Sequence, residues 1–163
     1  MNVVFKQTDR SDLEELGKIL NYYIESTSVN FHLKALNNNE LTETLILNDL
    51  RFNTFSIFID GKISGFVQLT QHKKRNAYDC TGEVSIYLEK DFTKKGIGKK
   101  ALEFIENYGK SKQFHSLIGT ICGENIASIN LFEKNGYLKC AHYKEVGLKY
   151  NHYLDVIALQ KLI

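Results

Sequence analysis

Residues 83–88 read Glu83-Val-Ser-Ile-Tyr-Leu88, and after a short loop residues 94–100 read Lys94-Lys-Gly-Ile-Gly-Lys-Lys100. In the first stretch Val84, Ile86 and Leu88 alternate with three more polar residues, and this period of two predicts a β-strand. The second stretch predicts a glycine turn that opens a helix. Such a turn favours an anion site, because glycine lets the backbone approach closely and the first amides of a helix lack internal partners.

The glycine turn matches neither of two common phosphate-binding motifs. No Gly-x4-Gly-Lys-Ser/Thr sequence occurs, and the third glycine of the dinucleotide fingerprint is missing. Four lysines surround the two glycines and would attract phosphate. A lysine-rich, solvated helix start is the plainer alternative, and the turn alone leaves both readings open.

Along the rest of the chain, hydrophobic periodicity predicts an alternation of strands and helices. We expect strands at 3–7, 55–59, 63–70, 83–88, 116–121, 137–146 and 153–159. We expect helices from Ser11 to Ser26, through Leu41, Leu45 and Leu50, and at 96–111 and 127–135. Ser11 is expected to cap the first helix, with Glu14 as its capping-box partner. The resulting order, β-α-α-β-β-β-α-β-α-β-β, predicts an α/β fold with a mixed sheet and helices on both faces.

Composition narrows the class of protein. The 163 residues are 43% hydrophobic and 25% charged, contain no proline and show no linker, so we expect one globular domain over 1–163. The net charge of +2 argues against a dedicated nucleic-acid binder. No apolar run is long enough for a membrane span, and residues 1–10 do not resemble a signal peptide.

Cysteines and histidines point to no disulfide framework and no metal site. Cys80, Cys122 and Cys140 are an odd number at wide spacing, which fits reduced thiols in the cytoplasm. The first two lack an activating neighbour in the sequence, so we expect structural residues rather than nucleophiles. The five histidines do not show metal-ligand spacing, and we predict no metal.

A second segment supplies context for the glycine turn. One strand after it, the chain reads Asn125-Ile-Ala-Ser-Ile-Asn-Leu-Phe-Glu-Lys-Asn-Gly-Tyr137. The turn and this segment together resemble the GCN5-related N-acetyltransferase (GNAT) family, which implies a mostly antiparallel sheet and acetyl-CoA as cosubstrate. Thr93 stands where the family usually has Gln or Arg. The residues that the resemblance assigns to the cofactor are Ile86, Tyr87, Leu88, Lys94, Lys95, Gly96, Ile97, Gly98, Lys99, Asn125 and Ser128.

Other stretches are similar to the phosphinothricin acetyltransferase branch. They are Tyr23 to Phe31, Lys73 to Glu83 with Arg75-Asn-Ala-Tyr-Asp79, Gly147 to Lys149, Tyr153 to Val156, and Gln160. The resemblance implies acetylation of the α-amino group of a glutamate-like amino acid, of the phosphinothricin or methionine sulfone type, by a homodimer. Alternatives are a GNAT enzyme for a peptide N-terminus, polyamine or aminoglycoside, or a non-catalytic CoA-binding module. Nucleic-acid binding through the lysines is disfavoured by the near-neutral charge.

Glu83 is the candidate catalytic residue. An ammonium cannot attack a thioester, and a carboxylate at the start of this strand could accept its proton directly or through water. A single strand glutamate is otherwise a solvated surface residue, but Glu83 matches the catalytic glutamate of the branch. Lys73 and Arg75, on one side if extended, are either a solvated run or ligands of substrate carboxylate or phosphinate oxygens. Phe31, Tyr78 and also Tyr22 are candidate pocket walls or ordinary packing residues.

Phe132 departs from the family pattern. The corresponding position often holds Tyr, or His in this branch, near the leaving thiolate, and phenylalanine cannot donate a proton. Either Tyr87, Tyr137 or Tyr143 donates it, or the thiolate leaves as such and takes a proton from water. A thiol with a pKa of about 8.5 allows the second route.

Overall fold

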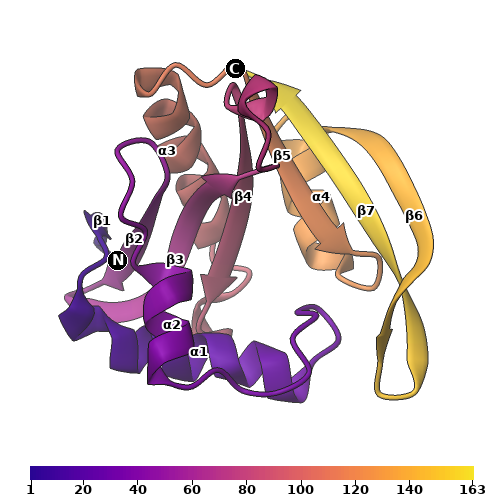
Figure 1. The fold of residues 1–163 in the computed structure, drawn as a ribbon. Helices are drawn as coiled ribbons and strands as arrows, with labels where there is room; N and C mark the ends of the chain where they lie inside the picture. Colours follow the sequence, from indigo (N-terminus) through magenta and orange to yellow (C-terminus); the bar gives the residue numbers. More distant parts are fainter.

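A seven-stranded sheet runs through the computed structural model, which describes residues 1–163 (Figure 1). The strand order is β1-β2-β3-β4-β5-β7-β6, and every neighbouring pair is antiparallel except β4 and β5. The strands are β1 (Val3–Gln7), β2 (Asn53–Ile59), β3 (Lys62–Gln71), β4 (Thr81–Leu88), β5 (Ser116–Cys122), β6 (Leu138–Lys149) and β7 (His152–Leu162). The predicted α/β class with a mixed, mostly antiparallel sheet is confirmed.

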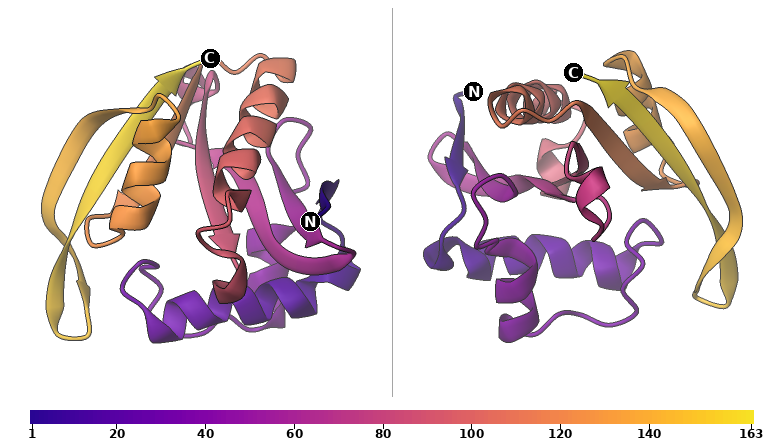
Figure 2. Two further views of the ribbon diagram at one scale, coloured as in Figure 1. Left: turned by 180° about the vertical axis from the view of Figure 1, so that it is seen from behind. Right: turned by 45° about the horizontal axis from the view of Figure 1, so that its top comes forward.

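Helices cover both faces of the sheet, as the sequence predicts. They are α1 (Leu13–Ser26), α2 (Asn38–Leu45), α3 (Ile97–Ser111) and α4 (Ile126–Lys134), with short 3₁₀ turns η1 (Arg10–Asp12), η2 (Asn76–Tyr78) and η3 (Lys90–Phe92). Figure 2 shows α1 and α2 on one side of the sheet and α3 on the other. No helix combines the length and the apolar composition that a membrane crossing would need.

Consecutive residues of β4 face opposite sides of the sheet. Val84 belongs to the larger hydrophobic cluster, which includes Ile105 of α3, and Ile86 packs against that cluster. Tyr87 packs against the second cluster, which α1 and α2 form with Phe66 of β3. The alternation predicted for 83–88 is therefore confirmed, and it turns Tyr87 and Glu83 to the α1 side.

The parallel strands β4 and β5 separate part of the way along their length. Their register covers three residue pairs and ends where Glu83 lies opposite Ile118. Beyond that point β4 stays paired with β3 to Leu88, and β5 stays paired with β7 to Cys122. Figure 1 shows the two strands diverging toward the lower side of the molecule. The facing edges of both strands therefore carry backbone N–H and C=O groups without a strand partner.

Two helix boundaries differ from the sequence predictions. Asp9, not Ser11, caps the first helical turn, because its carboxylate accepts the Ser11 amide at 2.7 Å and Asp12 completes the capping box. The second helix ends at Leu45, and the Leu50 side chain is 86% exposed. Leu50 lies five residues after Leu45, which would put it about 140° around a helix from the buried stripe.

Candidate active site

Two adjoining cavities open where β4 and β5 separate, and they form one cleft. The larger, of about 420 Å³, is lined by Val29, Asn30, Phe31, His32, Glu83, Tyr87, Thr120, Cys122 and Val156. The smaller, of about 60 Å³, is lined by Val29, Val84, Ser85, Ile86, Tyr87, Thr120, Ile121, Cys122, Asn125, Ser128 and Phe132. Four residues line both. The cleft therefore runs from Glu83 at one end to the N-terminus of α4 at the other.

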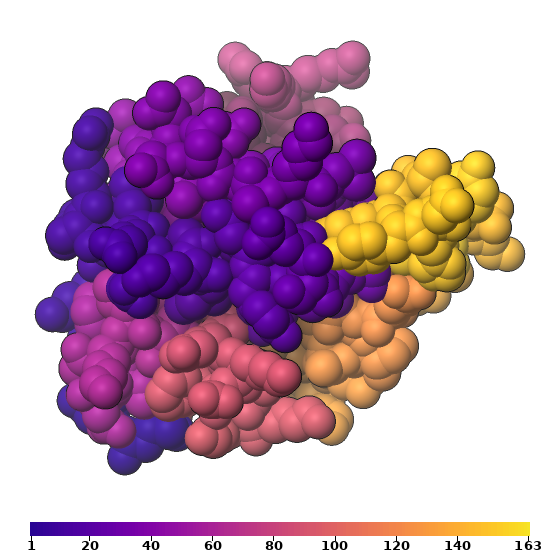
Figure 3. Space-filling view, turned by 90° about the horizontal axis from the view of Figure 1, so that it is seen from below, coloured from indigo at the N-terminus to yellow at the C-terminus, as the bar shows by residue number.

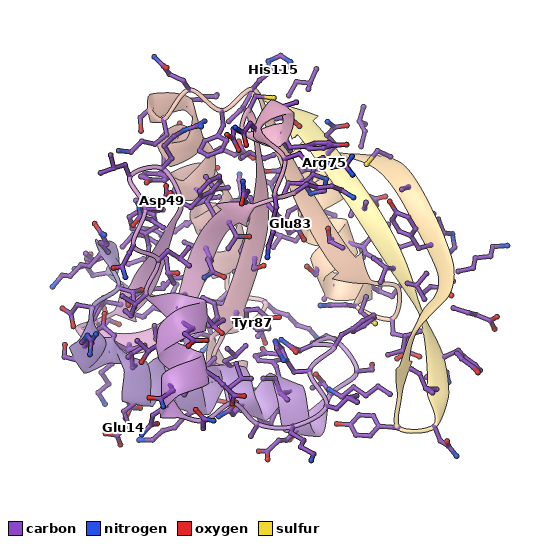
Figure 4. The ribbon with its side chains drawn as sticks, viewed as in Figure 1. Glu14, Asp49, Arg75, Glu83, Tyr87 and His115 are labelled. Carbon is purple, nitrogen blue, oxygen red and sulfur yellow. The ribbon has the colours of Figure 1, made fainter.

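Glu83 projects from the point at which the strands separate. Its side chain is 27% exposed and lines the larger cavity. One carboxylate oxygen, Oε2, lies 3.1 Å from Nδ1 of His72, the residue that follows β3. Figure 4 shows Glu83 and Tyr87 along the same strand beside the opening of the sheet. A partly desolvated carboxylate with one oxygen engaged suits proton abstraction from a ligand in this cavity.

Tyr87 lies two residues further along β4 and lines both cavities. Its ring stacks on Phe66 with centroids 5.1 Å apart and meets the edge of Tyr23 at 5.4 Å. The side-chain amide of Asn30 donates a hydrogen bond to the Tyr87 hydroxyl at 2.9 Å. Because an amide nitrogen cannot accept, the phenolic O–H remains free to donate elsewhere. Burial raises the pKa of Tyr87, so the hydroxyl is a neutral donor.

A buried lysine holds the loop that carries Asn30. Lys149 of β6 is 4% exposed, and its ammonium donates to the Asn30 carbonyl oxygen at 2.7 Å and to the Ile24 carbonyl oxygen. Burial lowers the pKa of Lys149. Asn30 Oδ1 in turn accepts the backbone amide of His32 at 2.9 Å. Sequence reasoning assigned no role to Asn30 or Lys149, although both stand in stretches that carry the family resemblance.

A second set of side-chain contacts joins three segments of the chain on the same side of the cleft. Glu124, just before α4, accepts a hydrogen bond from Ser28 at 2.6 Å and contacts His152 Nε2 at 2.7 Å. The Ser28 hydrogen bond, followed by the His152 contact, lowers the pKa of Glu124. Figure 3 shows the end of the β6–β7 hairpin, in yellow, projecting beside the segment between α1 and α2. Three segments far apart in sequence thus meet at one wall of the cleft.

The glycine turn forms an open helix N-terminus. Gly96 is the N-cap of α3, has φ +79°, and no side chain caps the helix. A Cβ built at Gly96 meets nothing within 4 Å, so the space above the turn is open. The first amides of α3, from Ile97 to Lys99, have no partners inside the helix. An uncapped helix start with open space and exposed lysines fits an anionic phosphate group.

Most of the residues predicted for the cofactor lie around this cleft and turn. Ile86, Tyr87, Asn125 and Ser128 line the smaller cavity, and Lys94, Lys95 and Lys99 are exposed at the turn. Asn125 Oδ1 accepts the Ser128 amide at 3.2 Å and so caps α4.

Two of the predicted cofactor residues, Leu88 and Gly98, do not line the cleft. Leu88 lies outside the cleft, because its side chain packs against the larger hydrophobic cluster and its carbonyl oxygen accepts the Tyr23 hydroxyl at 2.7 Å. A Cβ at Gly98 would come within 2.8 Å of Leu131 Cδ2, so this glycine lets α3 and α4 approach closely. The conformational need for glycine therefore falls on Gly96, not on Gly98.

The predicted substrate residues are only partly brought together. Phe31 lines the larger cavity, whereas Lys73, Arg75 and Tyr78 are exposed in the β3–β4 loop and do not line it. The loop bends at 72, 74 and 75, so the argument from an extended segment was wrong. In Figure 4 Arg75 lies beyond Glu83, toward the end of the molecule where His115 is labelled. Tyr22 of α1 lines separate cavities away from Glu83.

Of the three candidate donor tyrosines, Tyr87 alone lines the cleft. Tyr137 is 1% exposed, and burial together with Glu106 raises its pKa in the core. Tyr143 is 52% exposed on β6. Phe132 is buried at the end of the smaller cavity.

Cys122 lines the cleft as a free thiol. No group of three or more His, Cys, Asp or Glu side chains has the arrangement to hold a metal ion.

Comparison with known proteins identifies the family. The Acetyltransferase (GNAT) domain model matches residues 5–158. Phosphinothricin N-acetyltransferase of Streptomyces viridochromogenes is 25% identical over 154 residues, or 94% of this chain and 84% of that protein. The L-methionine sulfoximine/L-methionine sulfone acetyltransferase of Salmonella typhimurium is 26% identical over 101 residues, 62% of this chain and 59% of that protein.

A solved structure shares the whole fold. The phosphinothricin acetyltransferase of Sinorhizobium meliloti, in complex with acetyl-CoA, has a TM-score of 0.94 at 21% identity. The superposition covers 100% of this chain and 89% of that one. The chain belongs to the GNAT family and is an acetyl-CoA-dependent acetyltransferase.

Proposed function

We propose that this enzyme acetylates the primary amine of a small amino-acid-like substrate, of the phosphinothricin or methionine sulfone type, by direct attack in a ternary complex. The observation that carries the proposal is that the Glu83 carboxylate lines a cavity of about 420 Å³, which suits one amino acid. The names of the relatives from Streptomyces viridochromogenes and Salmonella typhimurium support this substrate class.

Acetyl-CoA is proposed to bind at the two places where the fold leaves backbone groups without partners. The first amides of α3, with Lys94, Lys95 and Lys99 around them, would hold the pyrophosphate of acetyl-CoA. The unpartnered edge of β4 after Glu83 offers N–H and C=O groups to the amides of the pantetheine arm. Acetyl-CoA supplies the thioester carbon that the amine attacks.

Glu83 is the proposed general base. Its free oxygen, Oε1, accepts the proton of the substrate ammonium, which leaves the amine lone pair able to attack. General-base assistance of this kind contributes roughly 10²–10⁴ in rate. Val29, Phe31 and Val156 supply apolar surface along the cavity in which the amine would react.

Tyr87 is the proposed donor to the negative charge that develops during the reaction. Because its pKa is raised, it keeps its proton beside a thiolate whose parent thiol has a pKa of about 8.5. It therefore acts as a hydrogen-bond donor, and the thiolate leaves as such and is protonated by water. With this role for Tyr87, the reaction needs no proton donor at the position of Phe132.

Lys73 and Arg75 are the proposed ligands of the acidic end of the substrate. Both are exposed, and neither takes part in an ion pair within the chain. Arginine beside a carboxylate or phosphinate makes two parallel charge-assisted hydrogen bonds, which would select glutamate-like amines.

We also propose a homodimer in the cytoplasm, where Cys80, Cys122 and Cys140 stay reduced. β6 pairs with β7 alone and so leaves one edge free. It exposes Leu138, Val146 and Leu148 by 74%, 58% and 54%. Light scattering should give twice the mass of the chain, and Leu148→Glu should give the mass of one chain. A single-chain mass for the unmodified protein would contradict the dimer.

The substrate proposal is tested by thiol release from acetyl-CoA with a panel of amines. Amino-acid sulfones and phosphinothricin should react fastest, and a peptide N-terminus, a polyamine and an aminoglycoside should react at least about tenfold more slowly. Preference for one of those other amines would replace the substrate class. Acetyl-CoA binding without turnover on any amine would contradict the enzymatic proposal.

A further inference from the structure

His72 meets the candidate base from outside the cleft. It follows the last residue of β3, and its ring turns toward β4, where Nδ1 lies 3.1 Å from Glu83 Oε2. The side chains of His72 and Glu83 are 20% and 27% exposed, so the contact is largely shielded from water. The His72 imidazole also meets the Tyr78 ring of η2 edge-on, with the two ring centroids 6.1 Å apart.

We propose that His72 is a positioning residue for Glu83. In the neutral imidazole, Nδ1–H donates to Oε2, fixes the carboxylate plane and leaves Oε1 to accept the proton of the substrate. No bond to substrate is made by His72 itself. This inference rests on the proposed role of Glu83 as the general base.

Two substitutions separate the hydrogen bond from the packing of the ring. His72→Asn places an amide nitrogen near the position of Nδ1, so it keeps a donor but has no ring. His72→Phe keeps a ring against Tyr78 but has no donor. His115, exposed on the loop before β5, provides the matched control His115→Phe.

The measurement is kcat and KM for the amine at pH 7, with thermal unfolding and acetyl-CoA affinity of each variant. His72→Phe should lose about tenfold in kcat/KM at neutral pH, a fraction of the contribution of the base. His72→Asn should stay within about threefold of the unmodified enzyme, because it restores the donor to Glu83 without the ring. His115→Phe and all acetyl-CoA affinities should be unchanged.

Several results would overturn the proposal. Full activity in His72→Phe would show that the contact does not position Glu83. A loss in His72→Asn as large as in His72→Phe would mean that the imidazole itself carries the proton. If His72→Phe does not fold, His72→Ala takes its place as the variant without a donor, and full activity in that variant would overturn the proposal. Failure of the proposed function is distinguishable, because the unmodified enzyme would then release no thiol with the amine panel.

Discussion

The side-chain amide of Asn30 lies 2.9 Å from the hydroxyl oxygen of Tyr87 and joins the loop after α1 to the strand that carries Glu83. The amide can only donate, so it fixes which way the Tyr87 proton points. The loop that closes the larger cavity therefore also orients the donor inside it. Lys149 holds that loop in place through the Asn30 carbonyl oxygen.

The direction of this hydrogen bond can be tested by removal and by reversal. Tyr87→Phe should lower kcat by about 10²-fold with little change in the KM of either substrate, because one donor to developing charge is lost. Asn30→Asp replaces the donor with an acceptor, so the Tyr87 proton turns to it and kcat should fall similarly. Tyr143→Phe is the control, since Tyr143 is exposed on β6. Unchanged kcat in Tyr87→Phe would remove Tyr87 from the mechanism.

The pH range of the reaction should reflect the environment of Tyr87. Burial raises the pKa of Tyr87 above the ordinary value for tyrosine, about 10. The phenol is protonated below its pKa, so the donor is present throughout the neutral and moderately alkaline range. At any pH below 10, the activity of the unmodified enzyme should therefore not decline through loss of this proton. An alkaline decline below pH 9 that is absent in Tyr87→Phe would contradict this.

The glycine turn is tested with two glycines that share a backbone conformation. Gly96 and Gly61 have φ +79° and +84°, and a Cβ at either meets nothing within 4 Å. Alanine at either position should cost about 1 kcal/mol of stability through left-handed strain. Only Gly96→Ala should weaken acetyl-CoA binding, by about tenfold, the effect of losing one hydrogen bond to a charged group. Equal affinity in the two variants would remove the turn from the cofactor site.

Arg75 should decide between acidic and neutral amines. Arg75→Ala should cost about 1.5–3 kcal/mol of binding for a glutamate-like substrate, through lost charge-assisted hydrogen bonds, and should spare neutral amines. Lys74→Ala, the exposed neighbour, is the control. The measurement is kcat/KM for an acidic and a neutral amine with each variant. An equal loss for both amines would show that Arg75 supports the loop and not the substrate.

The sequence predicted what depends on local patterning. The alternation in 83–88, the glycine turn and the order of elements are properties of neighbouring residues, and the structure reproduces them. The predicted continuation of the second helix through Leu50 was wrong. A leucine five positions after a buried one would lie about 140° around a helix from it, and the Leu50 side chain is exposed. The residues of the candidate site that matched the family stretches, such as Glu83 and Phe31, do line the cleft.

The long-range contacts could not be predicted from the sequence. The separation of β4 and β5 depends on how each pairs with its other neighbour, and no local pattern encodes it. His72 reaches Glu83 only because the chain bends after β3. The family pattern assigns Gly98 to the cofactor, but the close approach of Leu131 depends on the packing of α3 against α4, which no local pattern encodes.

The central claim is that Glu83 is the general base, and Glu83→Gln tests it most directly. Glutamine keeps the shape and hydrogen-bonding capacity but cannot accept the ammonium proton. kcat/KM for the amine should fall by about 10²–10⁴ at pH 7 and recover toward the pKa of the amine, with the acetyl-CoA dissociation constant unchanged. Glu14→Gln, an exposed glutamate of α1, should behave as the unmodified enzyme. A near-normal rate at pH 7 in Glu83→Gln, or a collapse of acetyl-CoA binding, would contradict the account.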